Sequence, residues 1–103
     1  MKQQTVLIEI FGTSPVIKIL DFLITYQLFD YPLTEIAKNS GVSYSSLQNI
    51  WKKLERNSLV IKTRRVGKSD LYKLNTHNPA IRELIKLDWK LVKGAEQKLA
   101  LFA

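Results

Sequence analysis

Apolar residues recur at helical spacing along most of the chain, and the breaks between these stretches predict four helices. Ser14 can cap the first helix, and Pro15 suits its first turn. Ser43 can cap the third, and Asn78 and Pro79 begin the last. The expected helices cover residues 15–28, 33–39, 44–56 and 79–103. Residues 6–11 could form a short strand or a helical turn, because six residues of mixed pattern do not decide between the two.

Between the third and fourth helices the pattern changes to that of a β-hairpin. β-Branched residues flank a turn that contains Gly67, so residues 59–65 and 70–74 are predicted to be paired strands. Ser40 and Gly41 end the second helix, since glycine tolerates the left-handed conformation of a tight turn. A short helix, a glycine turn, a capped amphipathic helix and a hairpin follow one another, and this order is more specific than any one of its parts.

The stretch from Leu33 to Leu47 resembles the helix-turn-helix of winged-helix transcription regulators, and Trp51 to Val60 is similar to their passage into the wing. The resemblance is to archaeal and bacterial regulators similar to the multiple-antibiotic-resistance and arsenical-resistance repressor families. It covers residues 14–75, about 60% of the chain. Asn57 stands where the group usually has glycine, and asparagine also accepts a left-handed conformation.

The fold class expected from these patterns is mainly α with a small β-hairpin, in one structural domain. Residues 1–78 hold the N-terminal segment and the winged helix-turn-helix, which is the DNA-binding region. Residues 79–103 form a long C-terminal helix for dimerisation.

Charge is concentrated in one part of the chain. The net charge is +7, and residues 49–75 hold eight positive and two negative side chains, a net +6. A solvated lysine-rich surface would spread the charge, so its local concentration favours a nucleic-acid partner.

The second helix of the motif fits the major groove of double-stranded DNA. Gln48 and Asn49 carry amides that can pair with adenine, and Tyr44 could contact a thymine methyl group or a phosphate. Wing cations are expected on phosphates or in the minor groove. The alternatives are polar side chains that only solvate a helix and an edge hairpin kept soluble by charge. The residues expected to contact DNA are Tyr44, Ser45, Ser46, Gln48, Asn49, Lys52, Lys53, Lys62, Arg64, Arg65 and Lys68.

The first and last helices carry more apolar surface than a small core can cover. The first has apolar residues on two faces, and the last has a roughly heptad stripe that Asp88 interrupts. We therefore expect a homodimer, which the resemblance also implies. The alternative is that the last helix only covers the core. The expected interface residues are Ile19, Phe22, Tyr26, Ile81, Leu84, Ile85, Trp89, Leu91, Val92 and Leu99.

Other functional classes find little support in the sequence. Without cysteine there are no disulfides or thiolate metal sites, which is compatible with a cytoplasmic location. The single histidine, His77, reads as a turn or capping residue, and no catalytic, metal or cofactor motif stands out. Glu9 interrupts a poor N-terminal signal pattern, and no apolar run is long enough to span a membrane. No sensor domain is evident, although a small-molecule effector could lodge at the dimer interface between the first and the last helix.

The function expected is that of a sequence-specific transcription regulator, not an enzyme, which binds double-stranded DNA as a dimer. The alternatives are a non-specific architectural DNA-binding protein and a winged-helix adaptor for protein or RNA.

Overall fold

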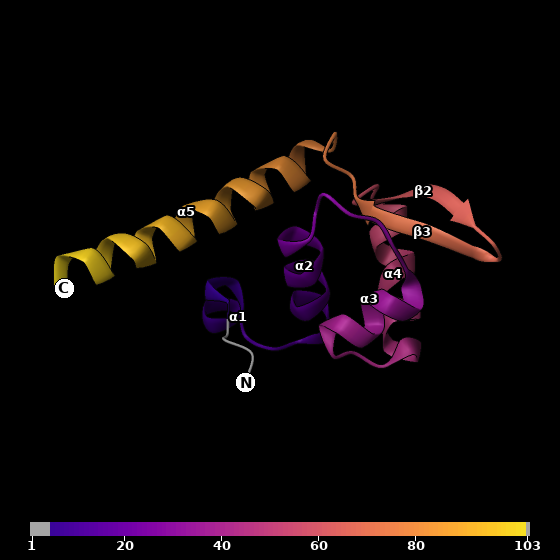
Figure 1. Ribbon diagram of the computed structural model, residues 1–103, viewed down its shortest axis with the longest axis horizontal. Coiled ribbons are helices and arrows are strands. Elements are labelled where there is room, and N and C mark those ends of the chain that lie inside the picture. The colour runs from indigo at the N-terminus through magenta and orange to yellow at the C-terminus, as the bar shows by residue number, and fades with distance from the viewer. Residues whose placement is uncertain (1–4, 103) are drawn as a thin grey trace.

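The computed structural model describes residues 5–102, which form a helical body with a small sheet at one end (Figure 1). The elements in chain order are α1 (Val6–Phe11), α2 (Pro15–Thr25), β1 (Tyr31–Pro32), α3 (Leu33–Ser40), α4 (Tyr44–Arg56), β2 (Val60–Val66), β3 (Ser69–Leu74) and α5 (Pro79–Phe102). Helices α2, α3 and α4 pack together. Helix α5 runs from the sheet past α2 and α1, so that its C-terminal end and the tip of the β2–β3 hairpin lie at opposite ends of the molecule.

Side-chain caps begin three of the helices where the sequence predicts them. The Ser14 hydroxyl accepts a hydrogen bond from the Ile17 amide, and the Ser43 hydroxyl accepts one from the Ser46 amide at 3.2 Å. The Asn78 side-chain oxygen Oδ1 accepts one from the Ala80 amide at 2.8 Å. These bonds satisfy amides that the first turn of a helix leaves unpaired. Gly41 has a φ of 72°, as expected for the residue that ends α3.

Two local features differ from the prediction, and one that the sequence left open is resolved. Helix α2 ends at Thr25 and not at Leu28, because Tyr26 leaves the helical conformation and the chain turns toward β1. Leu28 is 86% exposed, so a longer helix would gain no burial there. The left-handed residue after α4 is Ser58, with a φ of 58°, and not Asn57, with a φ of −94°. The ambiguous segment 6–11 is helical.

One hydrophobic core connects the helices to the sheet. Its largest fully buried side chain is Trp51 of α4, which packs edge to face on Tyr72 of β3. The buried apolar residues of the core are Leu7, Ile19, Phe22, Leu23, Ile24, Ile36, Ala37, Leu47, Trp51, Leu54, Val60, Leu74 and Ile81.

Three residues predicted at a dimer interface belong to this core. Ile19 and Ile81 are 0% and 1% exposed, and Phe22 is 8% exposed, so they retain almost no surface for a second copy. The prediction was wrong for these residues because it counted α2 as having an uncovered apolar face. Helix α1, whose structure the sequence left open, packs on α2 and on α5, while α3 and α4 cover the rest of α2.

The sheet has the order β1-β3-β2 and is antiparallel throughout. The two-residue strand β1, which the sequence did not predict, pairs with β3 through Tyr31 opposite Tyr72 and Pro32 opposite Leu71. The hairpin is regular except at Thr63, where β2 has an extra residue between the pairs Lys62–Tyr72 and Arg64–Leu71. Strand β3 is thus the central strand, and its middle residues Leu71 and Tyr72 are paired on both sides. None of the helices in residues 5–102 is long and apolar enough to cross a membrane.

Candidate nucleic-acid interface

Helix α4 divides sharply into a buried and an exposed face. Leu47, Trp51 and Leu54 are buried and Ile50 is half-buried, as predicted. Gln48, Asn49, Lys52 and Lys53 are exposed. Within the described residues their side-chain polar atoms have no protein hydrogen-bond partner, so they are available to an outside ligand.

The first turn of α4 is less available. The Ser43 hydroxyl donates to the Ser46 hydroxyl at 2.9 Å and lies 3.4 Å from that of Ser45. Ser46 is half-buried, whereas Ser45 is exposed. Tyr44 is 44% exposed, the predicted position for a contact at the N-terminal end of the recognition helix. Ser45 and Ser46 thus form part of the helix cap as well as of the exposed surface.

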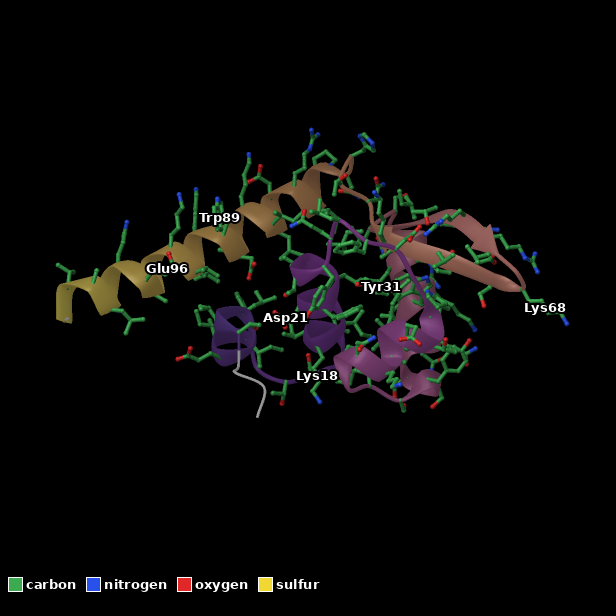
Figure 2. The ribbon with its side chains drawn as sticks, in the orientation of Figure 1. Lys18, Asp21, Tyr31, Lys68, Trp89 and Glu96 are labelled. Carbon is green, nitrogen blue, oxygen red and sulfur yellow. The ribbon has the colours of Figure 1, made fainter. Side chains whose placement is uncertain are left out.

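The wing cations are mostly paired with carboxylates of the chain itself. Lys62 Nζ lies 3.1 Å from Asp70 Oδ1, and Arg65 Nε lies 4.0 Å from the same oxygen. Among the described residues Lys68 has no carboxylate within salt-bridge distance. Figure 2 shows it at the outer end of the hairpin, pointing away from the helices. The wing cation most available to an anionic ligand is therefore Lys68.

Arg64 is held by a residue that sequence reasoning did not consider. Its Nε donates to Asp30 Oδ2 at 3.0 Å and its Nη2 donates to Asp30 Oδ1 at 3.2 Å. The Thr63 hydroxyl also donates to Asp30 Oδ2. These bonds lower the pKa of Asp30 from 3.8 to about 2, with the Arg64 hydrogen bond as the largest cause.

An open hollow of about 230 Å³ shows how the parts of this surface meet. It is bordered by the N-terminal end of α3, the N-terminal end of α4 and the inner side of the hairpin turn. Its lining residues are Pro32, Leu33, Thr34, Tyr44, Lys68, Ser69, Asp70 and Tyr72. The start of helix α4 and the wing therefore share one face of the molecule.

Of the residues that line this hollow, only Tyr44 and Lys68 were predicted site residues, and among the others Thr34 and Tyr72 carry hydroxyls that a ligand could bind. Thr34 lies in the first turn of α3, which has no side-chain cap. Tyr72 is half-buried, and burial is the first cause that raises the pKa of its hydroxyl, followed by the charges of Glu55 and Asp70. The hydroxyl therefore stays protonated and able to donate. The uncapped start of α3, recognisable by Pro32 at the cap position, was a signal in the sequence for the first of these residues.

A larger open hollow of about 630 Å³ lies between α1, α2 and the end of α3. Asp21 lines it and accepts a 2.7 Å hydrogen bond from the Thr5 hydroxyl; Figure 2 labels Asp21 between these helices. The residues around it are distinct from those of the α4 and wing surface. No group of three or more histidine, aspartate or glutamate side chains that could hold a metal occurs in residues 5–102.

Apart from the buried Ile81, the predicted dimer residues on α5 range from half-buried to exposed. Leu84, Ile85 and Leu91 pack partly against the core, and Val92 is half-buried. Trp89 and Leu99 are 60% and 72% exposed, and Tyr26, which directly follows α2, is 47% exposed. Three exposed apolar residues near the same end were not predicted: Ile10, Phe11 and Leu101. Apolar side chains thus remain uncovered on α1 and on the projecting part of α5.

No protein-family model and no curated protein sequence matches the chain. Solved structures do match. MepR, a transcription regulator of the Staphylococcus aureus multidrug efflux pump MepA, has a TM-score of 0.62 and 19% identity, over 82% of this chain and 61% of that one. Lactococcus lactis ZitR in complex with DNA has a TM-score of 0.59 and 14% identity, over 84% of this chain and 60% of ZitR.

The antimony-specific transcriptional repressor AntR has a TM-score of 0.59 and 18% identity, over 89% of this chain and 78% of AntR. The chain spans about three fifths of the length of the MepR and ZitR chains above. At these identities the similarity concerns the fold. The predicted resemblance is confirmed at that level: the chain has the winged-helix fold of transcription regulators, with five helices, a small antiparallel sheet and a long C-terminal helix in the described residues.

Proposed function

We propose that the protein is a transcription regulator that binds double-stranded DNA in a sequence-specific manner. Helix α4 lies in the major groove, and the β2–β3 wing contacts the backbone or the minor groove. The observation that carries the proposal is the shared face described above. The α3 start, the α4 start and the wing turn border one hollow, so a single duplex can contact all three.

Within this proposal the contacts divide by chemistry. Gln48 and Asn49 read base edges, because a side-chain amide matches the donor and acceptor pair of adenine in the major groove. Lys52, Lys53 and Lys68 contact phosphates, which fix the position of the protein but carry no sequence information. The β2–β3 hairpin, residues 60–74, holds five positive side chains including Lys68 in its turn, and after Asp70 and Asp30 are subtracted a net +3 remains toward the DNA.

We also propose that the protein acts as a homodimer, with contacts through α1 and the projecting part of α5. Exposed apolar residues on both helices support it, namely Ile10, Phe11, Trp89, Leu99 and Leu101. Two copies would present two recognition helices, and their binding sites would lie about one helical turn apart in a two-fold symmetric sequence. The structures of a DNA-bound ZitR and of the repressor AntR are of the same fold, which is consistent with this assignment. A cytoplasmic location follows from a role on DNA.

The test is selection of bound duplexes from a random DNA pool, followed by affinity measurements over a range of salt concentrations. We expect one enriched sequence with two-fold symmetry, and an affinity that falls steeply with salt because several phosphates are neutralised. Binding without sequence preference would replace the regulator by an architectural DNA-binding protein. No binding to duplex DNA at low salt would refute both and favour an adaptor for protein or RNA.

A further inference from the structure

Asp30 connects the two outer strands of the sheet across its central strand. It immediately precedes β1, which pairs with one edge of β3, whereas its partners Thr63 and Arg64 lie in β2, on the other edge. The side chain of Asp30 is 17% exposed and that of Arg64 is 64% exposed. The carboxylate is thus largely enclosed by the contacts that it makes.

The partners of Asp30 lie at the irregular point of the hairpin. Thr63 is the extra residue of a β-bulge, and bulges change the direction of a strand and of its side chains. The Thr63 hydroxyl donates to Asp30 and lies 3.2 Å from the carbonyl oxygen of Leu71 in β3. The three strands are therefore joined by side-chain bonds at the residue where the wing begins to leave the body.

Arg64 binds this carboxylate through two hydrogen bonds from one planar guanidinium. This two-point geometry fixes the orientation of the arginine as well as its distance, which a single contact does not. A phosphate that bound Arg64 would have to displace both bonds and leave the enclosed carboxylate of Asp30 without its cation.

We propose that Asp30 is a positioning residue for the wing: it holds Thr63 and Arg64 so that the hairpin keeps its direction relative to α4, and Arg64 serves this purpose and does not contact DNA phosphates. This corrects the role that the sequence suggested for Arg64. The part of this proposal that concerns DNA rests on the proposed function, whereas the positioning of Thr63 and Arg64 by Asp30 does not.

The proposal is tested by whether removal of the negative charge of Asp30 tightens or weakens DNA binding. Asp30→Asn raises the net charge by one near the DNA face, so simple attraction predicts tighter binding to a duplex of about 20–30 base pairs. Loss of positioning predicts the opposite, weaker binding by about two- to fivefold, the range expected for an exposed ion pair. Glu35→Gln is the matched control, because it changes the charge equally at an exposed position of α3 that has no bond to the wing.

Two further variants distinguish positioning from phosphate contact. We expect Arg64→Ala and the double variant Asp30→Asn with Arg64→Ala to bind as weakly as Asp30→Asn alone, with the salt slope of the unmodified protein. A phosphate contact by Arg64 would instead lower that slope by about 0.9 and make the two effects additive. A lower salt slope with additive effects would overturn the proposal. Unchanged or tighter DNA binding by Asp30→Asn would also overturn it.

Hydrogen exchange of backbone amides gives a readout that does not need DNA. We expect residues 60–66 to exchange faster in Asp30→Ala and Arg64→Ala than in the unmodified protein or Glu35→Gln, because the loss of the Asp30 contacts increases local opening. If the unmodified protein binds no DNA, the proposed function fails and exchange alone decides on positioning. Equal exchange in all variants would refute the positioning role even in a protein that binds DNA.

Discussion

Trp51 in α4 meets Tyr72 in β3 edge to face, with ring centroids 5.4 Å apart and ring planes at 75°. Trp51 is 2% exposed, so this contact joins the recognition helix to the wing inside the core. Edge-to-face geometry is favourable for aromatic pairs because the positive edge of one ring faces the negative face of the other. The relative placement of the two predicted DNA-contacting elements therefore depends on a buried pair that itself touches no DNA.

Replacing Trp51 should cost stability in proportion to the volume removed. Trp51→Ala is expected to lower the free energy of unfolding by about 3–5 kcal/mol, and Trp51→Phe by about 1–2 kcal/mol. The smaller loss of stability in Trp51→Phe has a second cause. The buried indole N–H has no acceptor among the described residues, and phenylalanine removes that unpaired donor. Urea unfolding measures both values. Trp89→Phe, at a 60% exposed position, is the control and should change stability by less than about 0.5 kcal/mol.

Lys68 at the wing tip should contribute to DNA affinity without contributing to sequence preference. We expect Lys68→Ala to weaken binding to all duplexes to a similar degree and to lower the salt slope by about 0.9, as for the loss of one phosphate contact. Fluorescence anisotropy at several salt concentrations measures the slope. Lys90→Ala, an exposed lysine on α5, should leave it unchanged. An equal loss of DNA affinity in Lys68→Ala and Lys90→Ala would mean that only the total charge of the protein determines this part of the affinity.

Gln48 and Asn49 should contribute to sequence preference. On the selected duplex, Gln48→Ala or Asn49→Ala is expected to weaken binding by about 1–3 kcal/mol, because a bidentate contact to a base is lost. Binding to an unrelated duplex should change little. The preference between the two duplexes, measured in competition, is the deciding quantity. An equal loss of affinity for both duplexes would instead indicate that these amides contact the DNA backbone.

Leu99 tests the proposed dimer. It is 72% exposed on α5, and a glutamate there would have to be buried without a partner at an apolar interface. Leu99→Glu is expected to raise the dimer dissociation constant by at least about tenfold, as measured by sedimentation velocity. Leu28→Glu changes a leucine that is 86% exposed and lies outside the proposed interface, so it should not affect assembly. A monomeric unmodified protein at all concentrations would contradict the proposal.

Asp88 should make the protein less stable as the pH rises. Partial burial, and then the negative charge of Asp21, raise the pKa of Asp88 above 3.8 in the folded chain. Between 3.8 and that raised value the folded state binds more protons than the unfolded state, so stability falls with increasing pH. Asp88→Asn should therefore raise Tm at pH 7 and give no gain at pH 3. Glu96→Gln, at an exposed position of the same helix, is the control. A gain from Asp88→Asn that is equal at both pH values would show that burial of the ionised group is not the cause.

Local chemistry explains which elements could be predicted from the sequence. The Ser43 cap, the left-handed Gly41 and the spacing of Leu47, Trp51 and Leu54 act within a few residues of one another, so α4 was predicted with its observed bounds. The hairpin and the start of α5 follow from equally local signals. Exposure of Gln48 and Asn49 followed from the same periodicity, because the buried positions of a helix determine the remaining ones.

Contacts between distant parts of the chain explain what could not be predicted. The partner of Arg64 is Asp30, 34 residues earlier, and no local pattern relates the two. Ile19 and Phe22 were assigned to a dimer interface because periodicity does not show how many neighbours cover a helix, and α1, α3 and α4 all pack on α2. Strand β1 was missed for a similar reason, since two residues form a strand only when β3 is there to pair with them.

The two-residue length of β1 divides the hairpin into parts of different stiffness. Strand β3 is paired on both edges only at Leu71 and Tyr72, and beyond these pairs residues 65–70 are held only by the bonds between β2 and β3. Bending of the outer part of the hairpin alone would therefore let the wing fit a narrow or a wide minor groove. On DNA of varying groove width the wing tip would follow the local shape of the duplex while α4 kept its depth in the major groove.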